Sequence, residues 1–416
     1  MRAPLLRLTG RGLALLVLGA AIAIAAAVIG EPDVVWIGLL MVVLPVLGLV
    51  LVGLTHPRLR MQRRVEPEEV PLGSRPRVVI ELENRFPASV SALDFRDRAP
   101  SEFGSDAKFS LVRGLGAWQQ PVGYELQANH RGHFRLGPLR ATATDPMGMA
   151  SYSWSVPGDD ATLSVTPRVH PLARLKDSMG AGSSGDATPQ RIGQAGQDDV
   201  LVREHRHGDD LRRVHWRMSA KQGELMVRLE EHPWDPSATL VIDTRAGAHF
   251  GEGPEGTLEW CISLGASVAA ELLSARYRVT ILSADSEVLS PGHVDNLSGR
   301  QRMLRRLTDV TPSEASTLME GLEDSTGTGN SQSIVGALGL LGAGDAAALT
   351  AVGSRMLQCA ALVPDAAAFG AGAAVVAAHD DACRLLEAEG WTIQRYRPGQ
   401  SVPDAWLAML ARREAR

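Results

Sequence analysis

Two uncharged apolar segments near the N-terminus constrain the architecture of this chain most strongly. They cover residues 12–30 and 34–54. Each is about long enough to cross a bilayer core at ~1.5 Å per helical residue. Only Glu31, Pro32 and Asp33 separate them. Because so short a connection forces the segments to run antiparallel, we expect a transmembrane hairpin over residues 12–54.

The charges around this hairpin predict its orientation. Arginines stand outside the apolar segments, at Arg2, Arg7, Arg11, Arg58, Arg60, Arg63 and Arg64, whereas the short connection carries only acids. The excess of Lys and Arg on cytoplasmic loops then places both termini and the soluble domains in the cytoplasm of a multi-pass cell-membrane protein. In the alternative, residues 25–27 end a cleaved signal peptide. The second segment would still stop transfer, so the later residues keep the same location.

Composition narrows the function classes. The 416 residues carry a formal net charge of -5, which gives no electrostatic reason to expect nucleic acid as a partner. Cys261, Cys359 and Cys383 lie far apart and form no metal-binding or redox pair. We expect no cofactor. Cys261 and Cys359 stand in apolar surroundings and are interpreted as small core residues.

Residues 65–172 follow the two-residue period of β-strands. Val78, Ile80 and Leu82 alternate with Val79, Glu81 and Glu83, and glycines and prolines interrupt such runs. Turn signals occur at Arg131-Gly132, Gly137-Pro138 and Asp145-Pro146-Met147-Gly148. The pattern predicts a β-sandwich of the immunoglobulin-like kind. Without clustered His, Cys or acids, it is interpreted as a spacer or docking module.

A Gly-, Ser- and Asp-rich linker over residues 173–199 precedes a charged segment, residues 200–230. Residues 203–221 of that segment hold six Lys or Arg, three His, three acids and one Trp. We expect a helix over residues 210–222, with Asp209 as its N-cap and Gly223 at its end. Arg212 would then lie one turn from Trp216, within cation–π reach.

Three functions compete for this charged segment. Its arginines suit phosphates, but interleaved acids oppose nucleic-acid binding. Metal binding by His205, His207 and His215 lacks supporting spacing. The favoured interpretation is a charged clasp between domains or toward a partner, because guanidinium and carboxylate groups form oriented bidentate pairs. An enzyme site built from Asp209, Arg212 and His215 remains the alternative from another class.

Residues 231–416 alternate strands and helices, which predicts a doubly wound, mostly parallel α/β sheet. Expected strands cover 238–243, 279–282, 334–341, 357–363 and 391–396, and expected helices cover 258–275, 300–307, 382–389 and 403–411. Ligands of such sheets bind at the carboxyl ends of strands. Asp243 ends the first of these strands and is therefore the first candidate for a ligand-binding residue.

The assembled motifs resemble a bacterial membrane protein family, domain-of-unknown-function family 58. The match lies at Arg203, Glu204, Gly208, Asp209, Arg212, Val214, Trp216, Ser219, Ala220 and Lys221, with Arg217 inside the same run. It extends to Arg131-Gly132, Gly137-Pro138-Leu139, Asp145-Pro146-Met147-Gly148, Pro167-Arg168-Val169 and Pro171-Leu172. His205 departs from the family's usual Tyr, and Lys221 stands for a usual Arg.

The resemblance implies a C-terminal domain similar to the von Willebrand factor type A domain. It also implies partnership with a MoxR-type AAA ATPase and an association with membrane transglutaminase-like proteins. Metal-binding type A domains carry Asp-x-Ser-x-Ser, but here Arg245 and Gly247 occupy the serine positions after Asp243. An arginine repels a cation and glycine offers no side-chain oxygen, so we expect no metal there.

These observations predict a non-enzymatic, membrane-anchored scaffold or adaptor for such an ATPase, in the maturation or assembly of cell-envelope proteins. The chain has no GxxxxGK[ST] loop and no G-x-S-x-G elbow. The alternatives are an enzyme that acts on an envelope precursor and, more weakly, a nucleic-acid-binding protein. Partner-binding or interdomain roles are assigned to Arg203, Glu204, Gly208, Asp209, Arg212, Trp216, Arg217, Ser219 and Lys221.

Overall fold

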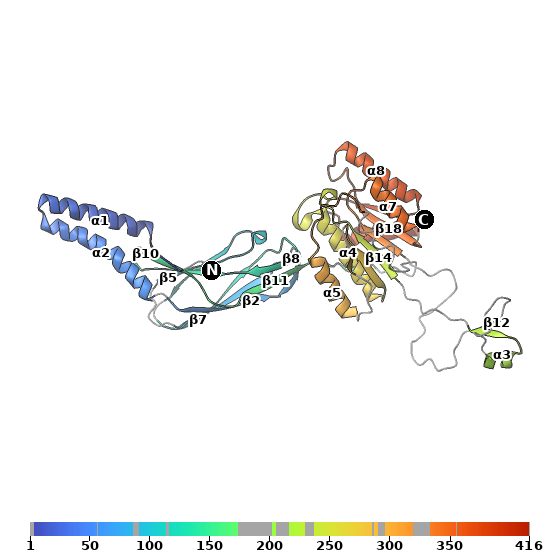
Figure 1. Cartoon of the computed structure of the whole chain (residues 1–416), viewed down its shortest axis with the longest axis horizontal. Coiled ribbons are helices and arrows are strands. Elements are labelled where there is room, and N and C mark those ends of the chain that lie inside the picture. The colour runs from blue at the N-terminus through green and yellow to red at the C-terminus, as the bar shows by residue number, and fades with distance from the viewer. Residues whose placement is uncertain are drawn as a thin grey trace. The chain divides into compact units, whose positions relative to one another are not determined.

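The computed structural model describes residues 4–55, 57–85, 91–113, 116–173, 202–204, 216–228, 237–284, 287–289, 296–318, 333–354 and 356–415. The chain forms two compact units (Figure 1). The first contains Met1–His170 with Thr244–Ser267 and Arg300–Glu314. The second contains Pro171–Asp243, Val268–Gly299 and Ala315–Arg416.

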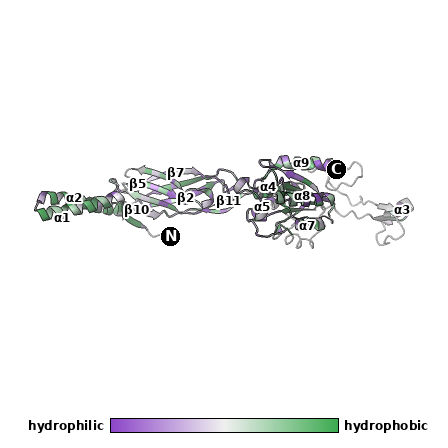
Figure 2. Cartoon of the chain, turned by 90° about the horizontal axis from the view of Figure 1, so that it is seen from above, coloured by the Kyte–Doolittle hydropathy of each residue, from purple (hydrophilic) through white to green (hydrophobic). Residues whose placement is uncertain are grey.

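The first unit begins with two antiparallel apolar helices, α1 (Gly10–Ile29) and α2 (Pro32–Thr55) (Figure 2). Both are long and apolar enough to cross a membrane, and only 17% and 22% of their most apolar windows are buried. A core helix of a soluble protein would be mostly buried. The helices approach closely at glycine, because a Cβ on Gly19 would lie 2.8 Å from the carbonyl oxygen of Gly38. Such small-residue contacts are typical of helix pairs in membranes.

Three sheets of the first unit share one hydrophobic core. A five-stranded sheet has the order β1-β10-β9-β5-β6, and three-stranded sheets have the orders β2-β4-β7 and β3-β11-β8. The strands are β1 Leu5–Leu8, β2 Leu59–Glu66, β3 Glu69–Pro71, β4 Arg77–Asn84, β5 Ser91–Asp97, β6 Ala107–Arg113, β7 Trp118–Glu125, β8 Gly132–Leu136, β9 Leu139–Thr144, β10 Ala150–Ser155 and β11 Ala161–Thr166; a short 3-10 turn, η1, covers Ser101–Phe103.

The two-residue period places the apolar side chains of these strands in the core. Val78, Ile80 and Leu82 are fully buried on β4, as their alternation predicts. Leu163 and Val165 are equally buried on β11. We call these three sheets the β-sandwich. Its layers form because successive side chains of a strand point to opposite faces, so the apolar ones point into the core.

The second unit is built on a six-stranded sheet with the order β16-β15-β14-β17-β18-β19. All neighbours run parallel except β15 and β16, which are antiparallel. The strands are β14 Ser237–Ile242, β15 Arg278–Leu282, β16 Glu287–Leu289, β17 Ser333–Ala337, β18 Gln358–Pro364 and β19 Thr392–Tyr396. The strand order reverses between β14 and β17, where β14 is fully buried.

Helices join these strands. α7 (Ala343–Gly353) and α8 (Ala373–Ala388) pack on the sheet through Leu349 and Leu386, while α9 (Val402–Glu414) follows β19. α4 (Thr257–Ser274) and α5 (Asn296–Thr308) each contribute residues to both units, and 3-10 turns η3 and η4 cover Ala246–Ala248 and Gly253–Glu255. Alternating strands and helices were expected, but α7 and β16 were not.

Several expected elements differ in length; for example, α5 and α9 extend beyond the helices expected over 300–307 and 403–411. The strand expected over 334–341 ends at Ala337, because the chain beyond it turns and Gly339 donates its N–H to Asp243. The helix expected over 382–389 is the second half of α8, whose first half is rich in alanine and valine.

Candidate functional site

The charged segment contains a small structured module. β12 (Val202–Glu204) pairs antiparallel with β13 (Met226–Arg228), and α3 (Trp216–Gln222) lies between them in the chain. The hydroxyl of Ser219 accepts a hydrogen bond from the N–H of Met226 at 2.8 Å. This bond connects the helix to the strand that follows. Gly223 ends α3 with a positive φ of 77°, as a C′ glycine should.

Trp216 is a strongly exposed aromatic residue of this module. Its side chain is 69% exposed at the start of α3, and Lys221 is exposed in the last turn. Met226 is buried instead. A large exposed indole on a short helix is a feature of interaction surfaces, where Trp is enriched.

The structure places only some of the predicted signature residues. Arg203 and Glu204 lie on β12, opposite Val227 and Met226, and Arg217 lies in α3. Gly208, Asp209 and Arg212 lie outside the described residues, as do His205, His207 and His215 and the expected helix residues 210–215. The proposed Asp209 cap and the Arg212–Trp216 contact therefore stay predictions.

Asp243 occupies the place where ligands bind in related sheet topologies. It follows β14 at the point where the strand order reverses, and its side chain is fully buried. Its Oδ2 accepts from the N–H of Gly339 at 3.1 Å, and its own N–H donates to Ala337 at 2.9 Å. The carboxylate thus connects the ends of β14 and β17.

The two residues at the degenerate serine positions belong to the first unit. Arg245 is buried and pairs in a short parallel bridge with Ser313, next to a 2.8 Å bond from the N–H of Ala246 to the Ser313 carbonyl. Gly247 is exposed within the 3-10 turn η3. No three His, Cys, Asp or Glu side chains gather into a possible metal cluster among the described residues.

A cysteine and a histidine meet in the core of the second unit. Cys383 Sγ lies 3.7 Å from Nε2 of His379, and both side chains are buried. Nε2 also lies 3.1 Å from the carbonyl oxygen of Pro364, while Nδ1 accepts from Leu341 at 3.0 Å. Burial raises the pKa of Cys383 to about 11, so its thiol stays protonated. Both groups are satisfied core residues without the features of a nucleophile and its base.

The turn motif at Arg131 contains a buried ion pair that sequence reasoning missed. Within the first unit, Arg131 Nη1 donates to both carboxylate oxygens of Glu259 at 2.6 Å, and Nη2 donates to the carbonyl of Val310. The two side chains are 4% and 16% exposed. Burial raises the pKa of Glu259 and lowers the pKa of Arg131, while their mutual attraction opposes both shifts.

A second turn motif joins the apolar helices to the β-sandwich. Asp145 is buried and accepts from the N–H groups of Met147, Met149 and Ala150. This shapes the turn against the start of α1, where Thr9 donates its hydroxyl to the Gly148 carbonyl at 2.6 Å. The expected turn at Asp145-Pro146-Met147-Gly148 is confirmed, and its hydrogen bonds with Thr9 connect the β-sandwich to the start of the helical hairpin.

The family model described as "Protein of unknown function DUF58" matches residues 201–367. Residues 201–367 of the chain therefore match domain-of-unknown-function family 58. The match covers the β12–α3–β13 module, Asp243 and the sheet through β18. The family assignment expected from the signature residues is therefore confirmed, and it brings no activity with it.

Comparisons with curated proteins and solved structures give no strong likeness. No curated protein matches the chain. A crystal structure of the CARDB domain of a Pyrococcus furiosus protein with two metal ions is 12% identical, covering 27% of this chain and 94% of that one, with a TM-score of 0.19. A Pseudomonas fluorescens alkylpurine DNA glycosylase bound to DNA is 13% identical, covering 32% and 39%, with a TM-score of 0.17. Likenesses this weak carry no argument about function.

Proposed function

We propose that this family 58 protein is a non-enzymatic, membrane-tethered scaffold that presents a partner-binding module to a MoxR-type AAA ATPase. The observation that carries the proposal is Trp216, 69% exposed on α3 inside the family-matched region. An indole that is exposed in the free chain is available for burial by a partner, and tryptophan is enriched among the residues that carry binding energy. The scaffold would act in the maturation or assembly of cell-envelope proteins, where a membrane transglutaminase-like protein is a further candidate partner.

The apolar hairpin supports the membrane tether. Its exposed side chains include Leu18, Ile24 and Leu54, and water is a poor solvent for such a surface. Arg7 and Arg58 stand outside the two helices and Arg11 lies in the first turn of α1, whereas Glu31 lies in the connection between the helices. This distribution supports a cytoplasmic location for the rest of the chain.

The sheet of the second unit supports a type A-like domain. Its strands follow a 3-2-1-4-5-6 order, counted along the chain from β14 to β19, with an antiparallel edge strand. Asp243 is held by Gly339, and Arg245 and Gly247 replace the serines, so the domain would bind partners without a metal. Titration of the full chain with Mg²⁺ tests this step: stoichiometric binding that Asp243→Ala abolishes would contradict it.

A pull-down tests the scaffold itself. Detergent-solubilised full chain is mixed with the MoxR-type ATPase of the same organism, comparing wild type with Trp216→Ala and Trp216→Ala/Lys221→Ala. Loss of a central Trp typically costs ~2 kcal/mol or more, so binding should weaken by at least about 30-fold. Leu407→Ala, which truncates a 51% exposed side chain on α9, is the matched control.

Circular dichroism and melting temperature accompany the pull-down. The proposal stands if the tryptophan variants melt like wild type, lose the ATPase and differ from Leu407→Ala. Equal capture by wild type and by both variants would show that α3 is not the partner surface. No capture by wild type would remove the ATPase from the proposal.

A further inference from the structure

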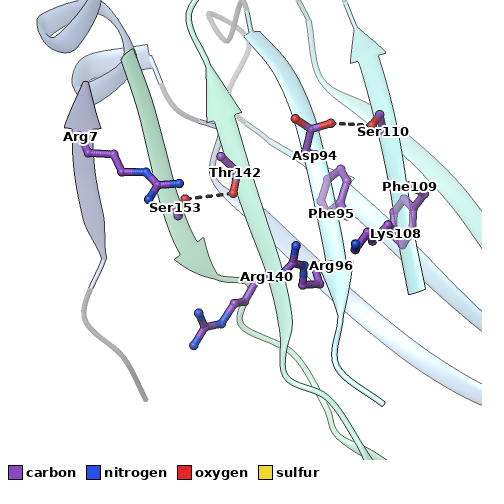
Figure 3. Close-up of a pocket in the computed structure, with 10 residues that line it drawn as sticks. All are labelled: Arg7, Asp94, Phe95, Arg96, Lys108, Phe109, Ser110, Arg140, Thr142 and Ser153. Carbon is purple, nitrogen blue, oxygen red and sulfur yellow. Dashed lines mark hydrogen bonds between the residues drawn. The ribbon is translucent and has the colours of Figure 1, made fainter. Parts of the chain in front are cut away.

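The exposed face of the five-stranded sheet carries a groove that none of the preceding functions uses. The groove has a volume of about 450 Å³ and is formed by side chains from β1, β5, β6, β9 and β10 (Figure 3). Its polar lining includes Thr142 and Ser153, joined by a 3.0 Å hydrogen bond. A volume of this size suits a small ligand.

Four cations face the groove, namely Arg7, Arg96, Lys108 and Arg140. Its one carboxylate, Asp94, accepts a hydrogen bond from Ser110 at 2.5 Å. Among the described residues, none of the four cations lies within 4.0 Å of a carboxylate oxygen. The groove is therefore strongly positive although the chain as a whole is acidic.

Three of these cations stand directly opposite one another. Arg96 on β5 pairs in register with Arg140 on β9, and on its other side with Lys108 on β6. Neighbouring strands lie ~4.8 Å apart, so the row is about 10 Å wide. Like charges opposite each other destabilise a sheet, and a bound anion would remove that cost.

We propose that this groove binds a small soluble anion that carries at least two linked phosphate groups. A diphosphate can reach adjacent members of the row, and arginine recognises phosphate oxygens in a bidentate manner. A single carboxylate or phosphate would leave at least one cation of the row unpaired. The neighbouring row of Thr142, Asp94 and Ser110 would receive hydroxyl groups of the same ligand, because a carboxylate accepts from hydroxyls.

The distance from the apolar helices favours a soluble ligand over a lipid headgroup. Arg7 precedes α1 by three residues and pairs with Ser151, whereas Arg140 pairs with Ser155. Four residues of strand therefore separate Arg7 from the cation row, about 13 Å at ~3.3 Å per residue. A headgroup layer is only about 5–8 Å thick on each side of the core. A headgroup beside α1 would reach Arg7 and not the row.

Calorimetric titration of the detergent-solubilised full chain tests the proposal. Inorganic pyrophosphate is the probe, and short-chain phosphatidylglycerol is titrated in a parallel arm. The variants are Arg96→Ala and Arg96→Ala/Arg140→Ala, with Arg60→Ala as the control, an exposed arginine on the opposite sheet. All three positions are surface side chains, and melting temperatures confirm folding.

We expect pyrophosphate to bind wild type and Arg60→Ala alike, and to bind about tenfold or more weakly for each groove arginine removed. Absence of pyrophosphate binding would overturn the proposal. Binding of phosphatidylglycerol alone, lost in the groove variants, would overturn it in favour of a headgroup site. Equal weakening in Arg60→Ala would reduce the effect to nonspecific charge attraction and would overturn it as well.

Discussion

The charged side chains of the first unit lie in two contrasting environments, either buried in ion pairs or exposed on the outer face of the β-sandwich. Arg63 is paired in the core with Asp97, whose second oxygen accepts from Tyr124 at 2.5 Å, and Arg131 is buried against Glu259 of α4. On the outer face, Arg96 and Arg140 stand in register without a carboxylate partner among the described residues. Buried charges must be satisfied internally, since desolvation costs several kcal/mol per ion. Exposed charges can stay without a carboxylate partner, but like charges in register repel one another, so the row without such a partner among the described residues is consistent with the bound anion proposed above.

The sharpest test of the buried set is Arg131→Ala. It leaves Glu259 buried without its cation and the Val310 carbonyl without its donor, so we expect a loss of ~3–5 kcal/mol. Chemical unfolding of the full chain measures the change. The control is Arg135→Ala, which breaks a pair with Asp160 that is 76% and 36% exposed. That loss should stay below ~1 kcal/mol, and equal losses in the two variants would contradict the distinction.

Tyr124→Phe removes one hydrogen bond from the buried set and leaves the ring in place. Asp97 is fully buried, and burial raises the pKa of its carboxyl group despite the neighbouring Arg63. Without the tyrosine hydroxyl, its charged form loses a donor. We expect ~1–3 kcal/mol less stability near neutral pH and a smaller loss in acid, where Asp97 accepts a proton. A loss that is the same at both pH values would assign the effect to packing alone.

His379 is a third kind of buried titratable group, one that burial keeps neutral instead of pairing it with an opposite charge. Burial lowers the pKa of His379 below its ordinary value of 6.5. The unfolded chain therefore binds the proton first as the pH falls, and stability declines below about pH 6.5 by up to ~1.4 kcal/mol per pH unit. His379→Asn keeps an acceptor for the Leu341 N–H but cannot titrate. Unfolding between about pH 7 and pH 5 should show a shallower slope in the variant; identical slopes would refute this role.

Local patterns predicted the framework of this chain well. The two apolar helices, the alternation on β4 and the buried run of β14 are each encoded by neighbouring residues. α7 escaped prediction because its alanines and glycines give almost no contrast between faces, although Leu349 and Val352 are buried. The strand at Ile334 was drawn too long because hydrophobic residues continue past the point where Gly339 turns toward Asp243.

The candidate sites depended on contacts that no local pattern encodes. Arg131 was predicted only as part of a turn, since its partner Glu259 lies 128 residues further along the chain. The cation row joins β9, β5 and β6, so it required the cross-strand register. Trp216 was singled out by its surroundings in the sequence, and the structure adds that its ring is exposed.

Arg96→Ala should produce the smallest change in stability among these variants, and the change should be a gain rather than a loss. Removing the central member of the row relieves repulsion with both Arg140 and Lys108, so we expect a gain of ~0.2–1 kcal/mol in phosphate-free, low-salt buffer. Added salt screens exposed charges and should erase the gain. Added pyrophosphate should make wild type the more stable of the two proteins. It binds wild type more tightly than the variant, and a ligand stabilises the folded protein that binds it more tightly. A variant less stable than wild type in both buffers would mean that Arg96 serves the fold, as Arg63 and Arg131 do.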